Sequence, residues 1–222
     1  MKKAIVLFIS ITIIGCNSTR SITNSEKEEI ISELNYIFEI DQKYAGLPFD
    51  DLVKKYGNEK AWKFFESKRD SVGTDNQIRI KKLYSEYGYL GFDKIGKEHS
   101  NKFWITIQHA DNDVKFQQQM LKALRKEIDR NNARKSNYAM LEDRIAINLN
   151  KKQSFGSQVT YNDEGQAIPK NGLLDSLNVD KLRLEYDLPP FKTYYNSMTT
   201  SHFEMNKENF LKRGIKEPKL YK

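Results

Sequence analysis

The stretch FWITIQHADNDVKFQQQMLKALRKEI, residues 103–128, contains two apolar patterns of helical period joined by a short polar connection. The first helix carries Phe103, Trp104 and Ile107 and is expected to end near His109. The second repeats apolar residues every three or four positions, at Val114, Phe116, Met120, Leu121, Leu124 and Ile128. Because residues 110–113 are the whole connection, we expect the two helices to be antiparallel neighbours. This pattern predicts a helical bundle.

Helical spacing continues on both sides of this stretch. A first helix is predicted over residues 25–44, opened by a capping box at Ser25-x-x-Glu28 and ended by Gly46 and Pro48. Two further helical zones are predicted, residues 52–65 with a break at Gly57 and residues 78–87 up to Gly88. Residues 138–149 are apolar on almost every side, which predicts a central, largely buried helix.

The pattern changes after Lys151. Phe155, Val159 and Tyr161 alternate, residues 162–165 have turn composition, and residues 166–169 can return as a second strand. Helix resumes at residues 179–186 and again after Pro189-Pro190. The predicted fold class is therefore mainly α, a single-domain helical bundle with one small β-hairpin near residues 153–169.

The N-terminus has the features of an export signal. Lys2 and Lys3 precede an apolar run, residues 4–14, that is too short to span a bilayer. Ile13-Ile14-Gly15-Cys16 resembles the bacterial lipobox, in which the cysteine receives the lipid. We predict a lipoprotein signal peptide at residues 1–15, a flexible tether at 16–24 and a single α-helical domain at 25–222. The alternative is an ordinary secretory signal with an incidental cysteine.

These assignments predict a protein anchored to a bacterial membrane in the cell envelope through lipid on Cys16. Cys16 is the only cysteine, so the fold cannot depend on an internal disulfide. Loss of Lys2 and Lys3 with the signal would lower the net charge from +7 to +5. The remaining basic residues alternate with acidic ones, and this argues against a nucleic-acid partner. The basic tail, residues 207–222, is interpreted as a frayed polar terminus.

The string Gln108-His109-Ala110-Asp111 is the most unusual polar feature. His109 is expected at the negative end of a helix dipole, close to Asp111 and Asp113, which favours the protonated imidazole. Such a histidine can act as a general acid or base. The structural alternative is that His109 caps its own helix while Asp111 or Asn112 caps the next one.

Asp143 and Arg144 on the central helix form a second candidate. Adjacent helical residues point about 100° apart, so each is expected to reach a different element. Arg144 can bind a carboxylate or phosphate, and Asp143 can hold His109 or Arg183. The alternative is a buried ion pair that fixes the packing of the helices.

Gln153, Gly156 and Gln158 form the third candidate. In a regular strand the two glutamines would lie on opposite faces, but a bulge at Gly156 would bring them together. They would then contact a ligand or, alternatively, pack the hairpin against the helices.

Familiar catalytic patterns are absent from the sequence. It contains no Gly-x-Ser-x-Gly elbow, no phosphate-binding Gly-rich loop and no His-Glu-x-x-His string. The three histidines are scattered along the chain, so we expect no metal and no cofactor.

Several strings resemble an uncharacterised bacterial family classed as a domain of unknown function, whose pattern reads W-x-x-x-Q-H-A-D, L-x-D-R, Q-x-Y-G-T-Q and D-x-R-R. The matching strings here are Trp104 to Asp111, Leu141 to Arg144, Gln153 to Gln158 and Asp180 to Arg183. The chain departs from the pattern at Phe155, Ser157 and Leu182. The resemblance covers residues 80–195 and implies no activity.

The leading hypothesis is that a polar cleft binds an unknown envelope ligand or protein. Its expected members are His109, Asp111, Asp143, Arg144, Gln158 and Arg183, with Gln108 and Gln153 as further ligand contacts. The alternative is a hydrolase in which His109 is the general acid or base and Asp111 or Asp143 orients it. A structural envelope scaffold is the second alternative.

Overall fold

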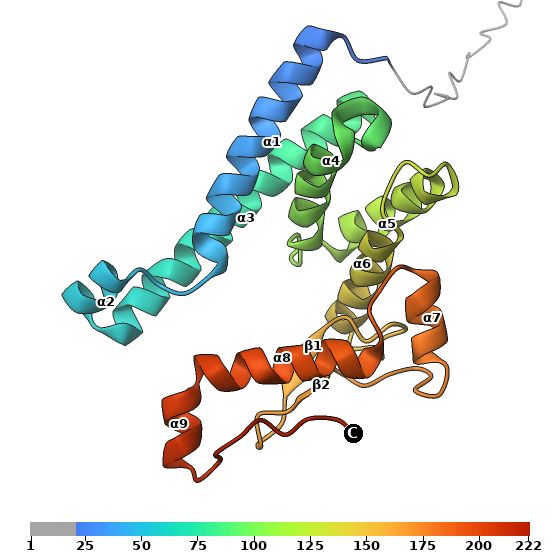
Figure 1. The fold of residues 1–222 in the computed structure, drawn as a ribbon. Coiled ribbons are helices and arrows are strands. Elements are labelled where there is room, and N and C mark those ends of the chain that lie inside the picture. The colour runs from blue at the N-terminus through green and yellow to red at the C-terminus, as the bar shows by residue number, and fades with distance from the viewer. Residues whose placement is uncertain (1–20) are drawn as a thin grey trace, which may run out of the picture.

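The computed structural model describes residues 21–222, which form nine helices and one two-stranded hairpin (Figure 1). The predicted signal peptide and Cys16 lie outside this range. Within it, no helix is both long enough and apolar enough to cross a bilayer. The mainly helical fold class predicted from the sequence is confirmed.

The chain first forms α1 (Asn24–Ala45), α2 (Asp50–Tyr56), α3 (Asn58–Tyr87) and α4 (Phe92–Gln108). The middle of the chain forms α5 (Val114–Asp129) and α6 (Lys135–Asn148). The last part forms β1 (Val159–Tyr161), β2 (Ala167–Pro169), α7 (Val179–Glu185), α8 (Phe191–Met205) and α9 (Lys207–Lys212). In Figure 1 the long α1 and α3 lie on one side of the molecule and the hairpin with α8 and α9 on the other.

The main core lies where α1, α3 and α4 meet α5 and α6. Leu34, Ile80, Phe103, Met120 and Leu141, one from each helix, are all buried in it. Helix α6 is central, as its apolar sequence predicts, and every second residue from Asn137 to Ile147 is buried. A smaller cluster around Phe155 and Leu188 joins α6 to the last part of the chain.

The start of α1 differs from the prediction in its capping residues. The capping box is formed by Thr23 and Glu26, two residues earlier than the predicted Ser25 and Glu28. The Glu26 backbone N–H donates to Thr23 Oγ1 at 3.3 Å, and the Thr23 N–H donates to the Glu26 carboxylate at 2.9 Å. This places the helix start at Asn24, one residue earlier than predicted.

Helix α3 is one continuous element of 30 residues, whereas the sequence predicted two separate helical zones. The predicted break at Gly57 is confirmed, since this residue has φ +77° and separates α2 from α3. Residues 66–77 contain no proline, and an isolated glycine such as Gly73 costs a helix only about 1 kcal/mol. The polar composition of this segment therefore reflects exposure and not a loop.

The connection between α4 and α5 changes the packing partner of the chain. Helix α4 packs mainly along α1, and α5 packs mainly along α6, with little contact between α4 and α5 themselves. The two helices are in contact, but each packs more extensively against another helix than the predicted pairing implies. The turn carries the chain from one layer of the bundle to the next.

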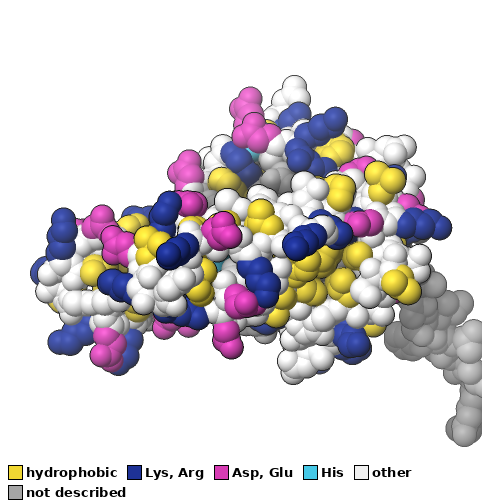
Figure 2. Space-filling view, turned by 60° about the horizontal axis from the view of Figure 1, so that its bottom comes forward, with side chains coloured by type: hydrophobic (Ala, Val, Ile, Leu, Met, Phe, Trp, Pro, Cys, Tyr) yellow, Lys and Arg dark blue, Asp and Glu magenta, His cyan; other side chains and the backbone are white. Residues whose placement is uncertain are grey.

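The C-terminal tail is docked against the hairpin, which corrects the interpretation of a frayed terminus. Tyr221 donates its hydroxyl to the Ala167 carbonyl at 2.8 Å and its N–H to Asn196 Oδ1 at 2.8 Å. On the face drawn in Figure 2, basic and acidic side chains are interleaved and no large area has a single sign of charge.

Candidate functional site

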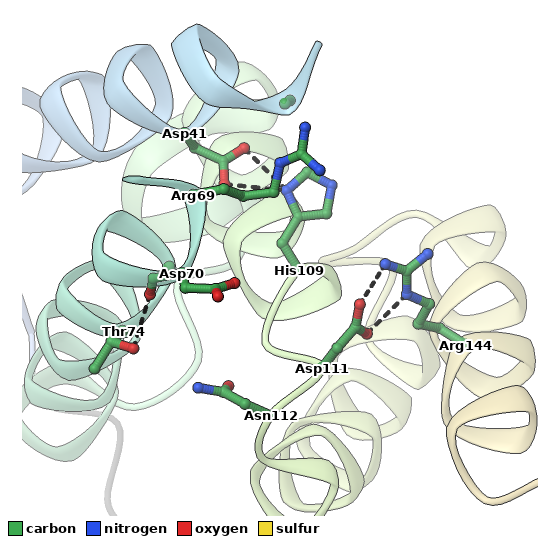
Figure 3. A pocket seen from close by; sticks show the side chains of 10 residues that line it. Asp41, Arg69, Asp70, Thr74, His109, Asp111, Asn112 and Arg144 are labelled. Atoms are coloured by element: carbon green, nitrogen blue, oxygen red, sulfur yellow. Dashed lines mark hydrogen bonds and ion pairs between the residues drawn. The ribbon is translucent and has the colours of Figure 1, made fainter. Parts of the chain in front are cut away.

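An open cleft of about 580 Å³ lies between α1, α3 and α6, with the connection from α4 to α5 at its base (Figure 3). The residues that line it are Asp41 and Ala45 from α1, Arg69, Asp70, Gly73 and Thr74 from α3, His109, Asp111 and Asn112 from the connection, and Arg144 from α6. We call it the polar cleft. Its volume lies within the range typical of small-molecule sites.

His109 follows the last residue of α4 and is paired with a carboxylate of α1. Its Nδ1 lies 2.9 Å from Asp41 Oδ2 and 3.1 Å from Asp41 Oδ1. The histidine side chain is 38% exposed, whereas that of Asp41 is 11% exposed. Its other ring nitrogen, Nε2, makes no hydrogen bond to residues 21–222. The hypothesis that Asp111 or Asp143 orients His109 is therefore wrong, because Asp41 does so.

Asp111 forms a two-pronged ion pair with Arg144. Arg144 donates from Nε to Asp111 Oδ1 at 2.8 Å and from Nη2 to Oδ2 at 2.5 Å. Asn148 adds a third hydrogen bond at 2.8 Å. Burial alone would raise the pKa of Asp111, but the hydrogen bonds and the charge of Arg144 outweigh it and lower that pKa. The pair is a preorganised, charged wall of the polar cleft.

Asp113, and not Asp111 or Asn112, caps α5. Its Oδ1 accepts the Phe116 N–H at 2.9 Å, and its Oδ2 accepts from Lys81 at 2.7 Å. Lys81 and the Phe116 N–H together lower the pKa of Asp113. Asp113 therefore caps α5, and Asp111 pairs with Arg144.

Arg69 and Asp70 add charges that the sequence did not single out. Arg69 donates from Nε to the Tyr44 carbonyl at 2.8 Å and from Nη2 to the Gly46 carbonyl at 3.0 Å, so it holds the end of α1. The side chain of Asp70 makes no hydrogen bond or ion pair within residues 21–222. Its carboxylate points into the polar cleft (Figure 3).

Asp143 lies away from the cleft and is fully buried. Its carboxylate accepts backbone N–H groups from Ser154 at 2.9 Å, Phe155 at 3.1 Å and Ser157 at 2.7 Å. Burial raises the pKa of Asp143, and these N–H donors oppose the rise without cancelling it. Asp143 hydrogen-bonds neither His109 nor Arg183, so both predicted pairings are wrong.

Arg183 holds the same loop through its carbonyl groups. It is 1% exposed and donates to the carbonyls of Phe155 at 2.7 Å, Gly156 at 3.2 Å and Pro189 at 2.7 Å. Burial lowers the pKa of its guanidinium. An arginine nevertheless stays charged at neutral pH, and carbonyl oxygens replace the water that it has lost.

Gln153 fixes the base of the hairpin. Its Nε2 donates to the carbonyls of Gln158 at 2.8 Å and Lys170 at 2.6 Å, and its Oε1 accepts the Gln158 N–H at 2.8 Å. The loop that brings the two glutamines together turns at Gly156, which has φ +63°. We refer to Asp143, Gln153, Arg183 and the loop 153–158 that they hold as the loop clamp.

The remaining predicted ligand contacts lie at or behind the cleft wall. Gln158 accepts from Arg144 Nη1 at 3.1 Å and so supports the wall from behind. Gln108 is buried and donates to the Met140 carbonyl at 3.3 Å, while its Oε1 has no partner among residues 21–222. The structure thus brings His109, Asp111 and Arg144 together in the cleft, with Gln158 behind them, and places Asp143, Gln153 and Arg183 in the loop clamp.

Asp41 and Arg69 each occupy a position at which the apolar spacing of their helix predicts a buried residue. Ile30, Leu34 and Ile37 form the buried stripe of α1, and Asp41 is the next position of that stripe. Arg69 follows the buried Phe65 by four residues on α3 in the same way. A charge at a position where the helical pattern demands an apolar residue indicates a paired or functional side chain.

The described residues contain no group of three or more His, Cys, Asp or Glu side chains arranged to hold a metal ion. The cleft contains a histidine paired with a carboxylate, His109 with Asp41, and the Asp70 carboxylate, which has no partner among residues 21–222. Such an arrangement can bind a polar molecule or transfer a proton.

Comparison with known proteins identifies a family but no activity. No curated protein and no solved structure matches the chain. A family of unknown function, DUF6624, matches residues 51–203. This match contains Arg69, His109, Asp111, Arg144 and the loop clamp, whereas Asp41 precedes it. The chain therefore belongs to the family of unknown function DUF6624.

Proposed function

We propose that this protein is a lipid-anchored component of the bacterial cell envelope whose polar cleft binds a small polar ligand. The observation that carries the binding proposal is the convergence of two charged pairs, Asp41 with His109 and Asp111 with Arg144, on one open cleft. Each pair is held by hydrogen bonds before a ligand arrives. Preorganised polar groups of this kind lower the cost of ordering a binding site.

Ligand binding is tested by measuring the melting temperature of the full-length protein in detergent. The panel of envelope components includes amino sugars, short peptides and lipid headgroups. A stabilising ligand is expected to lose its effect in His109→Ala and Arg144→Ala. The matched control is Arg79→Ala, because Arg79 is an α3 arginine paired with Glu33 and Asp75 outside the cleft. If no compound raises the melting temperature, the binding proposal is rejected and the result favours a structural envelope scaffold.

The anchoring part of the proposal rests on Cys16 and its lipobox-like context. Cells that express the full chain and grow with labelled palmitate are expected to label it in the membrane fraction. Cys16→Ser is expected to abolish the label, whereas Ser18→Ala retains it. Label on the Cys16→Ser variant would reject lipidation at this residue.

A second candidate function is hydrolysis, favoured by the hydrogen bond from His109 Nδ1 to Asp41. This contact leaves Nε2 available to accept a proton from water as the water oxygen attacks an ester, and to return that proton to the leaving alkoxide. Asp41 would act as the positioning residue. Turnover of nitrophenyl esters that falls at least about 100-fold in His109→Gln supports this function. Equal turnover in the wild type and in His109→Gln excludes a hydrolase that uses His109.

A further inference from the structure

The charges of the polar cleft differ in whether the protein already uses them. Asp41 is bound to His109, and Asp111 accepts from Arg144 and Asn148. These groups shape the walls but offer little unused capacity. The chemistry of a ligand is therefore set by the groups that remain unpaired.

Two unused groups lie next to each other on α3 and have opposite charge. The Asp70 carboxylate has no partner among residues 21–222, and one nitrogen of Arg69, Nη1, makes no hydrogen bond to this part of the chain. In Figure 3, Asp70 points to the middle of the cleft, whereas Arg69 extends toward the end where Asp41 and His109 lie. Although the two residues are adjacent in sequence, the Asp70 carboxylate and the Arg69 guanidinium therefore lie at different places in the cleft.

The space beside these groups is open. Gly73 lies one helical turn after Arg69, and a Cβ added there would meet no atom within 4 Å. Arg69 is held in place by the carbonyls of Tyr44 and Gly46, so its unused nitrogen needs no rearrangement to meet a ligand. A purely anionic ligand would leave the Asp70 carboxylate without a partner, and a purely cationic one would leave Arg69 Nη1 without one.

We propose that the polar cleft binds a compact zwitterion of short-peptide size, with its ammonium group on Asp70 and its carboxylate on Arg69. This inference rests on the proposed ligand-binding function and names the class of ligand. Both contacts are charge-assisted hydrogen bonds, which are stronger than neutral ones. His109 lies beside Arg69 at the carboxylate end of the cleft (Figure 3).

The test uses four peptides that differ only in their end charges: triglycine, N-acetyl-triglycine, triglycine amide and the doubly blocked peptide. Titration calorimetry on the full-length protein in detergent is expected to give the highest affinity for triglycine. Blocking either end is expected to weaken binding by at least about fivefold. Equal affinity for free and blocked peptides overturns the proposal.

Variants assign each end to its residue. Asp70→Asn is expected to remove the penalty for N-acetylation and to keep the penalty for amidation, whereas Arg69→Gln does the reverse. The control is Asp75→Asn, the same substitution on the same helix at a residue that pairs with Arg79. Because Arg69 also holds the end of α1, its variant is checked by thermal unfolding, and Asp70→Asn alone still decides the ammonium contact. An unchanged penalty in Asp70→Asn overturns that contact.

Failure of this inference differs from failure of the proposed function. If triglycine does not bind but another compound stabilises the protein through His109 and Arg144, the zwitterion is rejected and the binding cleft stands. If no compound in either experiment binds, both are rejected.

Discussion

The polar cleft and the loop clamp are built from the same kinds of side chain and differ in their access to water. Each contains aspartate and arginine, and adjacent residues of α6 supply one member to each, Asp143 to the loop clamp and Arg144 to the cleft. Asp143 and Arg183 are buried and hydrogen-bond to the backbone of the loop 153–158, and Arg183 also donates to the Pro189 carbonyl. Arg144 and His109 are partly exposed and pair with carboxylates at an open surface.

Burial, and not residue type, therefore separates the charges that hold the loop clamp from those that remain accessible in the polar cleft. A buried charge must be fully hydrogen-bonded, so its capacity is consumed by the protein. A partly exposed pair has water as an alternative partner, so it contributes little to stability and can exchange water for a ligand. Substitutions in the two regions are therefore expected to have very different costs.

The largest effect is expected for Asp143→Ala. The substitution leaves the N–H groups of Ser154, Phe155 and Ser157 buried without an acceptor. We expect a loss of about 3 to 5 kcal/mol in the free energy of unfolding, measured by urea denaturation. The comparison breaks down if Asp111→Ala in the cleft costs as much.

Gly156→Ala is expected to cost about 2 to 3 kcal/mol, from positive-φ strain and overpacking. Gly156 has φ +63°, and an added Cβ would lie 2.9 Å from Leu173 Cδ2 and 3.3 Å from Phe191 Cε2. Gly73→Ala is the control, because this glycine has open space around it and lies within a helix. Similar urea midpoints for the two variants would contradict a tightly held loop.

A smaller effect, with a defined pH dependence, is expected for Asp111→Asn. The pKa of Asp111 is lowered in the folded protein, so its contribution to stability is fully present above the ordinary value of 3.8. That contribution is lost as the pH falls through the lowered pKa. Unfolding at pH 6 should therefore separate wild type and variant by up to about 1 kcal/mol, and the gap should close in strong acid. A gap that widens in acid would reverse the sign of this coupling.

The smallest effect on stability is expected for His109→Gln, at most about 0.5 kcal/mol, because the His109 side chain is 38% exposed. The same variant is expected to abolish ligand-induced stabilisation. The melting temperature with and without ligand measures both quantities. A large loss of stability with an unchanged response to ligand would show that His109 stabilises the fold and does not bind the ligand.

Helix periodicity predicted most of the fold because burial on one face leaves a local pattern. The central helix, the breaks at Gly57 and Gly88, and the hairpin after Lys151 all follow from neighbouring residues. The continuous α3 did not, because its middle third is exposed on most sides and lacks an apolar stripe. The docked tail also escaped prediction, since the contact between Tyr221 and Ala167 spans 54 positions.

The sequence predicted the cleft residues His109, Asp111 and Arg144 but not Asp41, Arg69 or Asp70. His109 and Asp111 are two residues apart, so their shared location followed from the short connection between α4 and α5. Asp41 lies 68 positions from His109, and no local pattern joins them. The string that contains Asp143 and Arg144 identified polar residues on an apolar helix, but only the three-dimensional packing decides which one reaches water.

The loop clamp also governs which amide protons exchange with solvent. Irregular loops normally exchange quickly because their N–H groups are bonded to water. Here the N–H groups of Ser154, Phe155 and Ser157 end on a carboxylate with no exposed surface. Their protons can leave only when α6 and the loop separate, so this loop is expected to be as slow to exchange as the helices around it. In deuterium labelling, residues 153–158 would then behave as part of the core although they belong to no helix or strand.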